Sequence, residues 1–191
     1  MSSVVSQSTT MVQHSLVKEY IPPKICYGLL HKGKYSDIGG TFGRFFSLLT
    51  DSSKSKDDSA ATKKEMSGCC GATTMDGKVL GLYLDNPETT KAEDLRSYAA
   101  MEVDVDGMKH DLPSEFEKIE VGGGIAAVMT VNGSYSQLAS AWQSFGKRVM
   151  EEKNWKFSTD DSKISQEVYI VMDQKDESKN VTRLIMFLDE E

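Results

Sequence analysis

An acidic side chain stands inside an apolar and aromatic run that extends from Gln166 to Met172. The run is short and rich in β-branched and aromatic residues, which is typical of a β-strand. If Glu167 faces a hollow, its carboxyl group could exchange a proton or hold a cation. If Glu167 faces water, it is an ordinary surface residue. The strand pattern leaves both orientations open.

Aromatic side chains could supply flat walls for such a site, because aromatic faces attract planar or cationic ligands and exclude water. The candidates for this role are Tyr83, Trp142, Tyr169 and Phe187. Core packing is the alternative reading for each of them. It is favoured for Trp142, which lies at helical spacing with Leu138 and Phe145. Tyr83 and Tyr169 occupy matching places in two similar halves of the chain.

Those halves are marked by a repeat: the pattern Gly-x-Tyr-Ser at Gly33 to Ser36 returns one hundred positions later at Gly133 to Ser136. Apolar residues follow both copies at steps of four, three and four residues, which is one face of an α-helix. They are Ile38, Phe42, Phe45 and Leu49, then Leu138, Trp142, Phe145 and Val149. The pattern predicts a helix after each copy, a turn at each glycine, and a cap from Ser36 or Ser136.

Short β-rich runs surround both predicted helices in the same order. They cover 25–30, 78–84 and 96–105 in the first half, and 125–131, 166–172 and 181–188 in the second. The repeating unit is therefore strand, helix, strand, strand. Two such units predict an α+β fold with an antiparallel sheet, helices on one face and a ligand cleft between the repeats.

The length of 191 residues fits one domain, which we expect over 21–191. Repeat one covers about 21–110 and repeat two about 114–191. Residues 51–67 are almost wholly polar and predict a mobile loop, with an alternative short helix from Ala60 to Met66. Residues 1–20 are expected to form a flexible N-terminal segment.

Charge and composition limit the kinds of partner that we expect. The net charge of −7 argues against direct nucleic-acid binding and fits a hydrophobic or cationic small molecule better. The sequence contains neither an apolar run long enough to span a membrane nor a signal-peptide core, so we expect a cytoplasmic protein.

The Cys and His residues of the sequence lack metal-ligand spacing, and we expect no metal and no cofactor. The adjacent pair Cys69 and Cys70 could be a strand edge or a reactive pair.

Taken together, these motifs resemble the GyrI-like (gyrase-inhibitor-like) small-molecule-binding family, from about Ile21 to the C-terminus. The residues that carry the resemblance are Gly33-x-Tyr35, Asp85-x-Pro87-Glu88, Leu95-Arg96, Gly133-x-Tyr135 and Glu167-x-Tyr169. In that family the domain occurs alone or as the effector-sensing half of multidrug-responsive regulators, and some members hydrolyse cyclopropane-bearing compounds. The resemblance implies that Glu167 is the acidic group of a ligand pocket.

The remaining family positions are expected to be structural. Asp85 could close an Asx-type turn, Pro87 ends a strand, and the hydroxyls of Tyr35 and Tyr135 could tie down turns.

Three functions remain open. The protein could bind lipophilic, planar or cationic or electrophilic compounds through Glu167 and the aromatic walls. It could hydrolyse strained, cyclopropane-bearing ligands, with Glu167 and Tyr169 as the catalytic residues. It could instead be a protein-interaction module, such as a gyrase inhibitor or adaptor, whose partner the sequence does not name.

Overall fold

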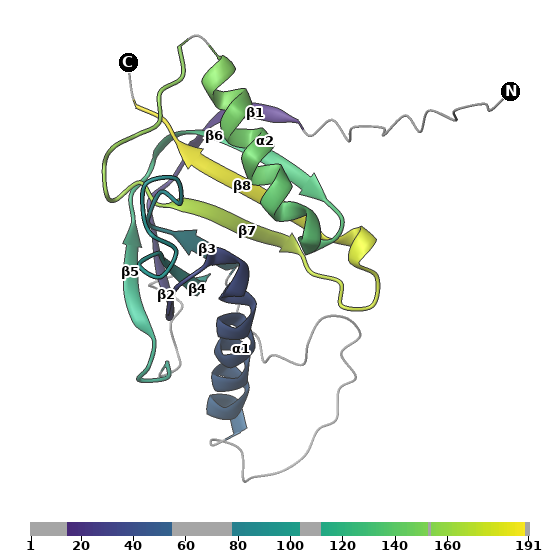
Figure 1. Ribbon diagram of the computed structural model, residues 1–191. Coiled ribbons are helices and arrows are strands. Elements are labelled where there is room, and N and C mark those ends of the chain that lie inside the picture. The colour runs from purple at the N-terminus through teal and green to yellow at the C-terminus, as the bar shows by residue number, and fades with distance from the viewer. Residues whose placement is uncertain (1–14, 55–77, 104–111, 153, 190–191) are drawn as a thin grey trace, which may run out of the picture.

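The structure is a computed structural model that describes residues 15–54, 78–103, 112–152 and 154–189. These residues form an eight-stranded sheet and two α-helices (Figure 1). The strands are β1 (Leu16–Ile21), β2 (Lys24–Lys32), β3 (Val79–Tyr83), β4 (Arg96–Glu102), β5 (Glu117–Val121), β6 (Gly124–Asn132), β7 (Ser165–Val171) and β8 (Val181–Phe187). The α-helices are α1 (Ile38–Lys54) and α2 (Leu138–Glu151), and the 3-10 turns are η1 (Tyr35–Asp37), η2 (Tyr135–Gln137) and η3 (Glu177–Lys179). Neither α-helix combines the length and apolar character that crossing a membrane requires.

The sheet is pseudo-symmetric about its centre. Its strands follow the order β1-β6-β8-β7-β3-β4-β2-β5, and every neighbouring pair is antiparallel. Repeat one contributes β2, α1, β3 and β4, and repeat two contributes β6, α2, β7 and β8. The two repeats meet where β3 pairs with β7. The predicted α+β class and duplicated units are confirmed, and all six predicted strands are present.

Two further strands, β1 and β5, escaped the sequence analysis. Each begins a repeat, yet each pairs with the other one: β1 precedes β2 but pairs with β6, and β5 precedes β6 but pairs with β2. Their sequences, LVKEYI and EKIEV, are short and carry charges, as is common for strands at a sheet edge. All but the last residue of β1 belongs to the segment 1–20 that was expected to be flexible. The exchange ties the two repeats together at both edges of the sheet.

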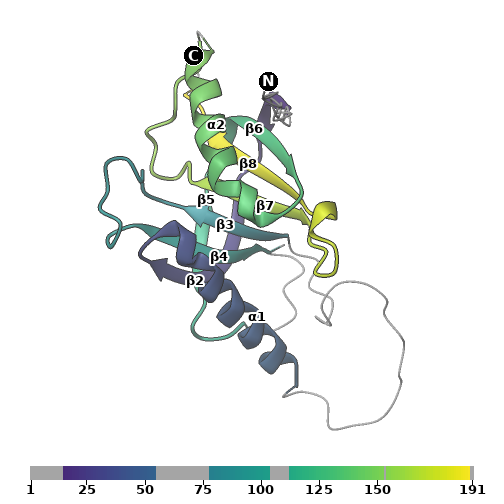
Figure 2. The same ribbon diagram turned by 45° about the vertical axis from the view of Figure 1, so that its right-hand side comes forward.

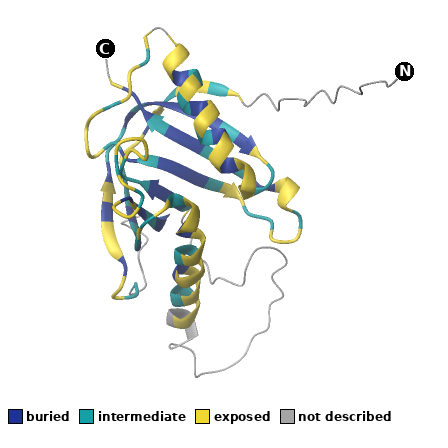
Figure 3. Ribbon diagram, viewed as in Figure 1, coloured by how far each residue is buried: buried dark blue, intermediate teal, exposed yellow. Residues whose placement is uncertain are grey.

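Both helices lie on the same face of the sheet (Figures 1 and 2). Helix α1 buries Phe45 against Leu29 and Ala99, whereas α2 buries Phe145 and Val149 against the strands of repeat two. The predicted apolar stripes are therefore the packing faces. Figure 3 shows the outward faces of both helices exposed and the strands between them largely buried.

The approach to each helix follows the repeat. Gly33 has φ of 120° and Gly133 has φ of 109°, in the left-handed region that favours glycine, so the turn predicted at each glycine is confirmed. The predicted serine caps are wrong. Ser134, rather than Ser136, accepts the backbone N–H at the start of η2, and no side chain caps η1, where Lys34 occupies the cap position.

The other face of the sheet carries a separate core, because side chains alternate between faces along each strand. Leu80, Leu82, Val168 and Ile185 belong to it, whereas Gly81, Tyr83, Glu167 and Tyr169 project toward the helices. The candidate site residues Tyr83, Glu167 and Tyr169 therefore lie on the helix-covered face.

The segment 51–67 starts differently from the expectation. Helix α1 continues to Lys54, so its last turn takes the first residues of the predicted loop. The rest of that loop, the alternative helix from Ala60 to Met66, and the Cys69 and Cys70 pair lie outside the described residues.

Candidate functional site

Glu167 lies at the middle of the sheet. It pairs with Gly81 of β3 on one side and with Leu184 of β8 on the other. Gly81 pairs onward with Ala99, and Ala99 and Leu184 belong to the clusters packed under α1 and α2 respectively. Glu167 is therefore placed between the two helices, where the repeats join.

The carboxyl group of Glu167 is buried, with a relative exposure of 4% for the residue. The indole Nε1–H of Trp142 donates a hydrogen bond to Oε1 at 2.6 Å, and the Tyr169 hydroxyl donates one to Oε2 at 2.7 Å. These bonds offset part of the cost of removing a carboxylate from water. The structure thus brings together Glu167, Tyr169 and Trp142, three of the residues that the sequence analysis selected.

Tyr83 reaches the same carboxyl group from β3. Burial is the largest cause that raises the pKa of Tyr83 well above its ordinary value, followed by the negative charge of Glu167 and a hydrogen bond with it. Tyr169 behaves alike: burial and then the charge of Glu167 raise its pKa well above the ordinary range. Both phenols therefore remain protonated at neutral pH and serve as hydrogen-bond donors.

An array of aromatic rings surrounds these groups with the symmetry of the repeats. The ring of Tyr83 lies edge-on to Tyr35 of its own repeat at 4.9 Å and to Trp142 of the other repeat at 6.0 Å between centroids. Tyr169 lies edge-on to Tyr135 of its own repeat at 5.5 Å and to Phe42 of the other repeat at 5.5 Å. Each helix thus contributes a ring to the tyrosine of the opposite repeat.

Phe187, predicted as a wall of this site, is not part of the array. It is buried in the core on the other face of the sheet, at 3% relative exposure, and the ammonium group of Lys163 lies 5.6 Å from its ring centroid. The alternation along β8 places it away from Leu184, the residue that flanks Glu167.

Three residues of the array were not selected from the sequence. Phe42 was assigned to a helix packing stripe, and Tyr35 and Tyr135 to turns. Their signal was present in the repeat itself: Phe42 matches Trp142, and Tyr35 matches Tyr135, at the spacing of one hundred. Applying the spacing to the candidate Trp142 would have added Phe42.

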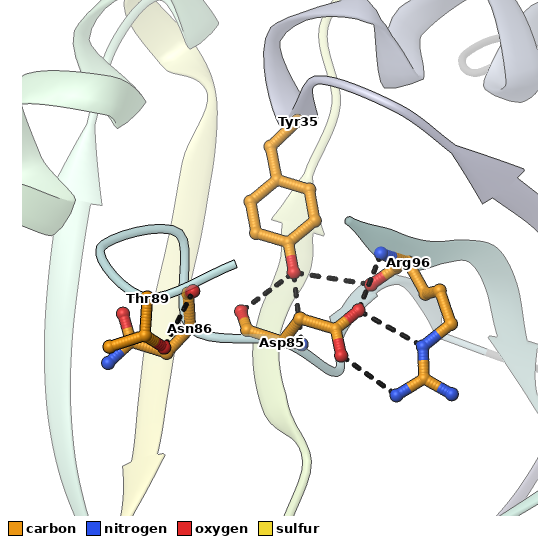
Figure 4. Close-up of polar contacts among 5 residues, drawn as sticks. All are labelled: Tyr35, Asp85, Asn86, Thr89 and Arg96. Atoms are coloured by element: carbon orange, nitrogen blue, oxygen red, sulfur yellow. Dashed lines mark hydrogen bonds and ion pairs between the residues drawn. The ribbon is translucent and has the colours of Figure 1, made fainter. Parts of the chain in front are cut away.

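Tyr35 also ties down the connection from β3 to β4 (Figure 4). Its hydroxyl accepts the backbone N–H of Asp85 at 3.0 Å and lies 2.8 Å from the Asp85 carbonyl oxygen. The Arg96 guanidinium donates to the Asp85 carboxylate, with Nη2 at 2.8 Å from Oδ1, and lowers the pKa of that carboxyl group. The Asx-type turn expected at Asp85 is made by Asn86 instead, whose Oδ1 accepts the N–H of Glu88 at 2.9 Å. The role expected of the Tyr35 hydroxyl is confirmed.

The charge of Glu167 is not paired with a basic side chain of the described residues. Among the described residues, no Lys or Arg forms an ion pair with Glu167. A buried carboxylate without a protein cation can hold a positive ligand, and aromatic faces favour the same charge. The described residues also contain no group of three or more Asp, Glu, His or Cys that could hold a metal ion.

Fold and site together define a pseudo-symmetric α+β ligand-binding domain with a single acid at its centre. The chain belongs to the family of the GyrI-like small molecule binding domain, whose model matches residues 15–188. A comparison with curated proteins finds no match.

Solved structures share this fold at low sequence identity. The C-terminal domain of EcmrR superposes with a TM-score of 0.62 at 14% identity, over 93% of this chain and 98% of that domain. In the complex of EcmrR with DNA, the TM-score is 0.61 at 15% identity, and 93% of this chain matches 58% of that one. SAV2435, solved bound to tetraphenylphosphonium, gives a TM-score of 0.58 at 13% identity, over 93% of this chain and 94% of that one. At such identities the likeness shows the fold.

Proposed function

We propose that this protein binds lipophilic small molecules that are planar, cationic or electrophilic, at the aromatic array around Glu167. The observation that carries the proposal is a carboxyl group at 4% exposure, held between two repeats and bordered by aromatic rings. A cation in this place gains from the negative charge and from the ring faces at once.

The chemistry of the array favours bulky organic cations over small inorganic ones. Lipophilic cations are weakly hydrated, so they lose little on entering a largely apolar site, whereas a small metal ion needs several oxygen ligands to replace its water. SAV2435, a protein of the same fold, has been solved with tetraphenylphosphonium, which therefore is a suitable first probe.

The direct test is Glu167→Gln, which preserves the side-chain shape but removes the charge. Calorimetric titration with tetraphenylphosphonium should show binding to the natural protein and an affinity about tenfold to a hundredfold lower in the variant, equal to about 1.4 to 2.8 kcal/mol. Glu151→Gln is the matched control, because Glu151 is exposed on α2, and its affinity should not change. Equal affinity of Glu167→Gln and the natural protein would contradict the proposed role of the acid.

Trp142 supplies an independent optical signal, since its indole donates to Glu167. In a Trp155→Phe background, tetraphenylphosphonium should change the fluorescence of Trp142 with the same midpoint as the calorimetric titration. A signal with a different midpoint would place the ligand elsewhere on the molecule.

Hydrolysis of cyclopropane-bearing compounds is a second candidate, favoured by the 2.7 Å hydrogen bond between Tyr169 and Glu167. In this reaction Glu167 takes a proton from water, the water oxygen bonds to a ring carbon, the strained bond breaks, and Tyr169 protonates the other carbon. The proton on Glu167 then returns to Tyr169 along their hydrogen bond. Mass spectrometry should detect a product heavier by one water, with its formation abolished in Glu167→Gln. Absence of product above the buffer rate would leave binding alone.

Nucleic acid and protein partners have less support than a small-molecule ligand. With a net charge of −7, we propose no direct contact with nucleic acid. A protein-interaction role would use segments other than the array, such as the polar stretch 51–67. Deleting 55–67 should therefore abolish capture of a protein partner but leave tetraphenylphosphonium binding unchanged.

A further inference from the structure

We propose that Gly81 determines the size of the cation that the aromatic array accepts, because the Tyr83 ring packs closely against the position that a Cβ atom would take. The inference rests on the proposed function, and it assigns a positioning role to a residue that carries no chemistry of its own. Gly81 is buried on β3, directly opposite Glu167 on β7.

The geometry of β3 supports the first step. Gly81 and Tyr83 project from the same face of the strand, and the Tyr83 side chain leans back over Gly81. A Cβ atom placed on Gly81 would lie 3.0 Å from the Tyr83 hydroxyl oxygen, 3.2 Å from Cε2 and 3.3 Å from Cζ. A side chain at position 81 therefore requires the Tyr83 ring to shift away from the strand by a few tenths of an ångström.

The neighbours of Tyr83 determine where the ring would move. Tyr35 lies edge-on to one side of it, and Trp142 lies at 6.0 Å on the side of α2. Displacement away from the strand would therefore push the ring toward the proposed site beside Glu167 and weaken its hydrogen bond with that carboxyl group. A bulky ligand beside Glu167 would contact the displaced ring first, so even one methyl group at position 81 should discriminate by ligand size.

The corresponding position of repeat two shows why the glycine matters. Glu167 occupies there the place that Gly81 occupies in repeat one, and Tyr169 leans toward the Glu167 carboxyl group as Tyr83 leans over Gly81. With an acid on one strand and no side chain on the other, both tyrosine hydroxyls can converge on one carboxyl group.

The test compares two cations of different size, tetraphenylphosphonium and trimethylphenylammonium, by calorimetric titration. Gly81→Ala should weaken tetraphenylphosphonium binding about tenfold or more relative to trimethylphenylammonium, the range that one extra methylene typically gives in an apolar pocket. Gly43→Ala is the matched control, since a Cβ there meets no atom within 4 Å, and it should leave the affinity ratio unchanged. An unchanged ratio in folded Gly81→Ala would overturn the inference.

A second variant covers the case in which Gly81→Ala does not fold. Tyr83→Leu removes the ring that competes for the space, so it should shift the affinity ratio in the opposite direction, toward tetraphenylphosphonium. A ratio equal to that of the natural protein would again overturn the inference.

A ligand-free measurement separates this inference from the proposed function. In Gly81→Ala the displaced Tyr83 interacts more weakly with the charge of Glu167, so one tyrosine should ionise at lower pH than in the natural protein, in a titration followed by the near-ultraviolet absorbance of tyrosinate. If the natural protein binds neither cation, the proposed function fails and so does the size limit, whereas the titration still decides whether Gly81 positions Tyr83. An unchanged titration curve would contradict that positioning.

Discussion

The two repeats share one backbone plan but differ where they meet. Tyr83 and Tyr169 occupy equivalent places, and so do Tyr35 and Tyr135, yet Gly81 in repeat one stands where repeat two has Glu167. Two acids directly opposite each other on neighbouring strands would repel and raise the cost of burial. The difference shows how a pseudo-symmetric fold can carry a single charge where its repeats meet: one repeat has an acid at this position and the other has a glycine.

The repeats also differ in how they hold the tyrosines Tyr35 and Tyr135. Tyr35 is fixed by the backbone of Asp85, whereas the hydroxyl of Tyr135 makes no hydrogen bond to a described residue, and Tyr135 is 39% exposed. Burial and then the charge of Glu177 raise the pKa of Tyr135. Repeat one therefore has the more rigid wall, and repeat two has the acid and the more accessible wall.

Truncating the buried helix phenylalanines should give the largest effects and test whether the repeats are equally packed. Phe45 and Phe145 are both fully buried, so Phe45→Ala and Phe145→Ala should each lower the free energy of unfolding by about 3–5 kcal/mol in urea titrations. Only Phe145→Ala should also alter Trp142 fluorescence, because their rings lie 5.7 Å apart. Met150→Ala, at a residue 72% exposed, is the control and should change the unfolding free energy by less than about 0.5 kcal/mol. A loss confined to one repeat would show that the other contributes little to stability.

Removing the hydroxyl group of Tyr35 or of Tyr135 should change the free energy of unfolding less, and by different amounts in the two repeats. Tyr35→Phe leaves the Asp85 N–H without its acceptor and should cost about 1–3 kcal/mol of unfolding free energy. Tyr135→Phe should cost less than about 0.5 kcal/mol. Thermal and urea unfolding of the two variants provide the measurement. Equal losses of unfolding free energy would contradict the view that Tyr35 is held more firmly than Tyr135.

The smallest effect concerns the charge that repeat one keeps at Asp85. Because Arg96 lowers the pKa of Asp85 in the folded protein, the carboxylate stabilises the fold above its unfolded pKa, and this contribution is lost as pH falls through the folded pKa. The difference in unfolding free energy between the natural protein and Asp85→Asn should therefore shrink as pH falls below about 4. It should stay at or below about 1 kcal/mol, since the Arg96 side chain is 51% exposed. Asp161→Asn, at an exposed residue, serves as the control, and a pH-independent difference for Asp85→Asn would contradict the ion-pair explanation.

Much of the fold could be predicted because repeat spacing and local periodicity are properties of the chain itself. The helices after Gly33 and Gly133 and the strands around Tyr83 and Tyr169 follow from patterns that need no knowledge of distant contacts. Strands β1 and β5 could not be predicted in the same way, since their charged sequences become strands only through pairing with the opposite repeat. Phe187 was misplaced because strand alternation indicates two faces but not which one the helices cover.

The sequence by itself determined the duplication and, among the described residues, the order of the two α-helices and of six of the eight strands. These follow from residue types at short spacing, which local backbone geometry turns into elements. The resemblance to the GyrI-like family directed attention to Glu167 and Tyr169. Only the tertiary structure decided that β3 and β7 join the repeats, that both helices cover the face of Glu167, and that Gly81 lies opposite it. Those facts depend on strand register, which long-range pairing and burial fix together.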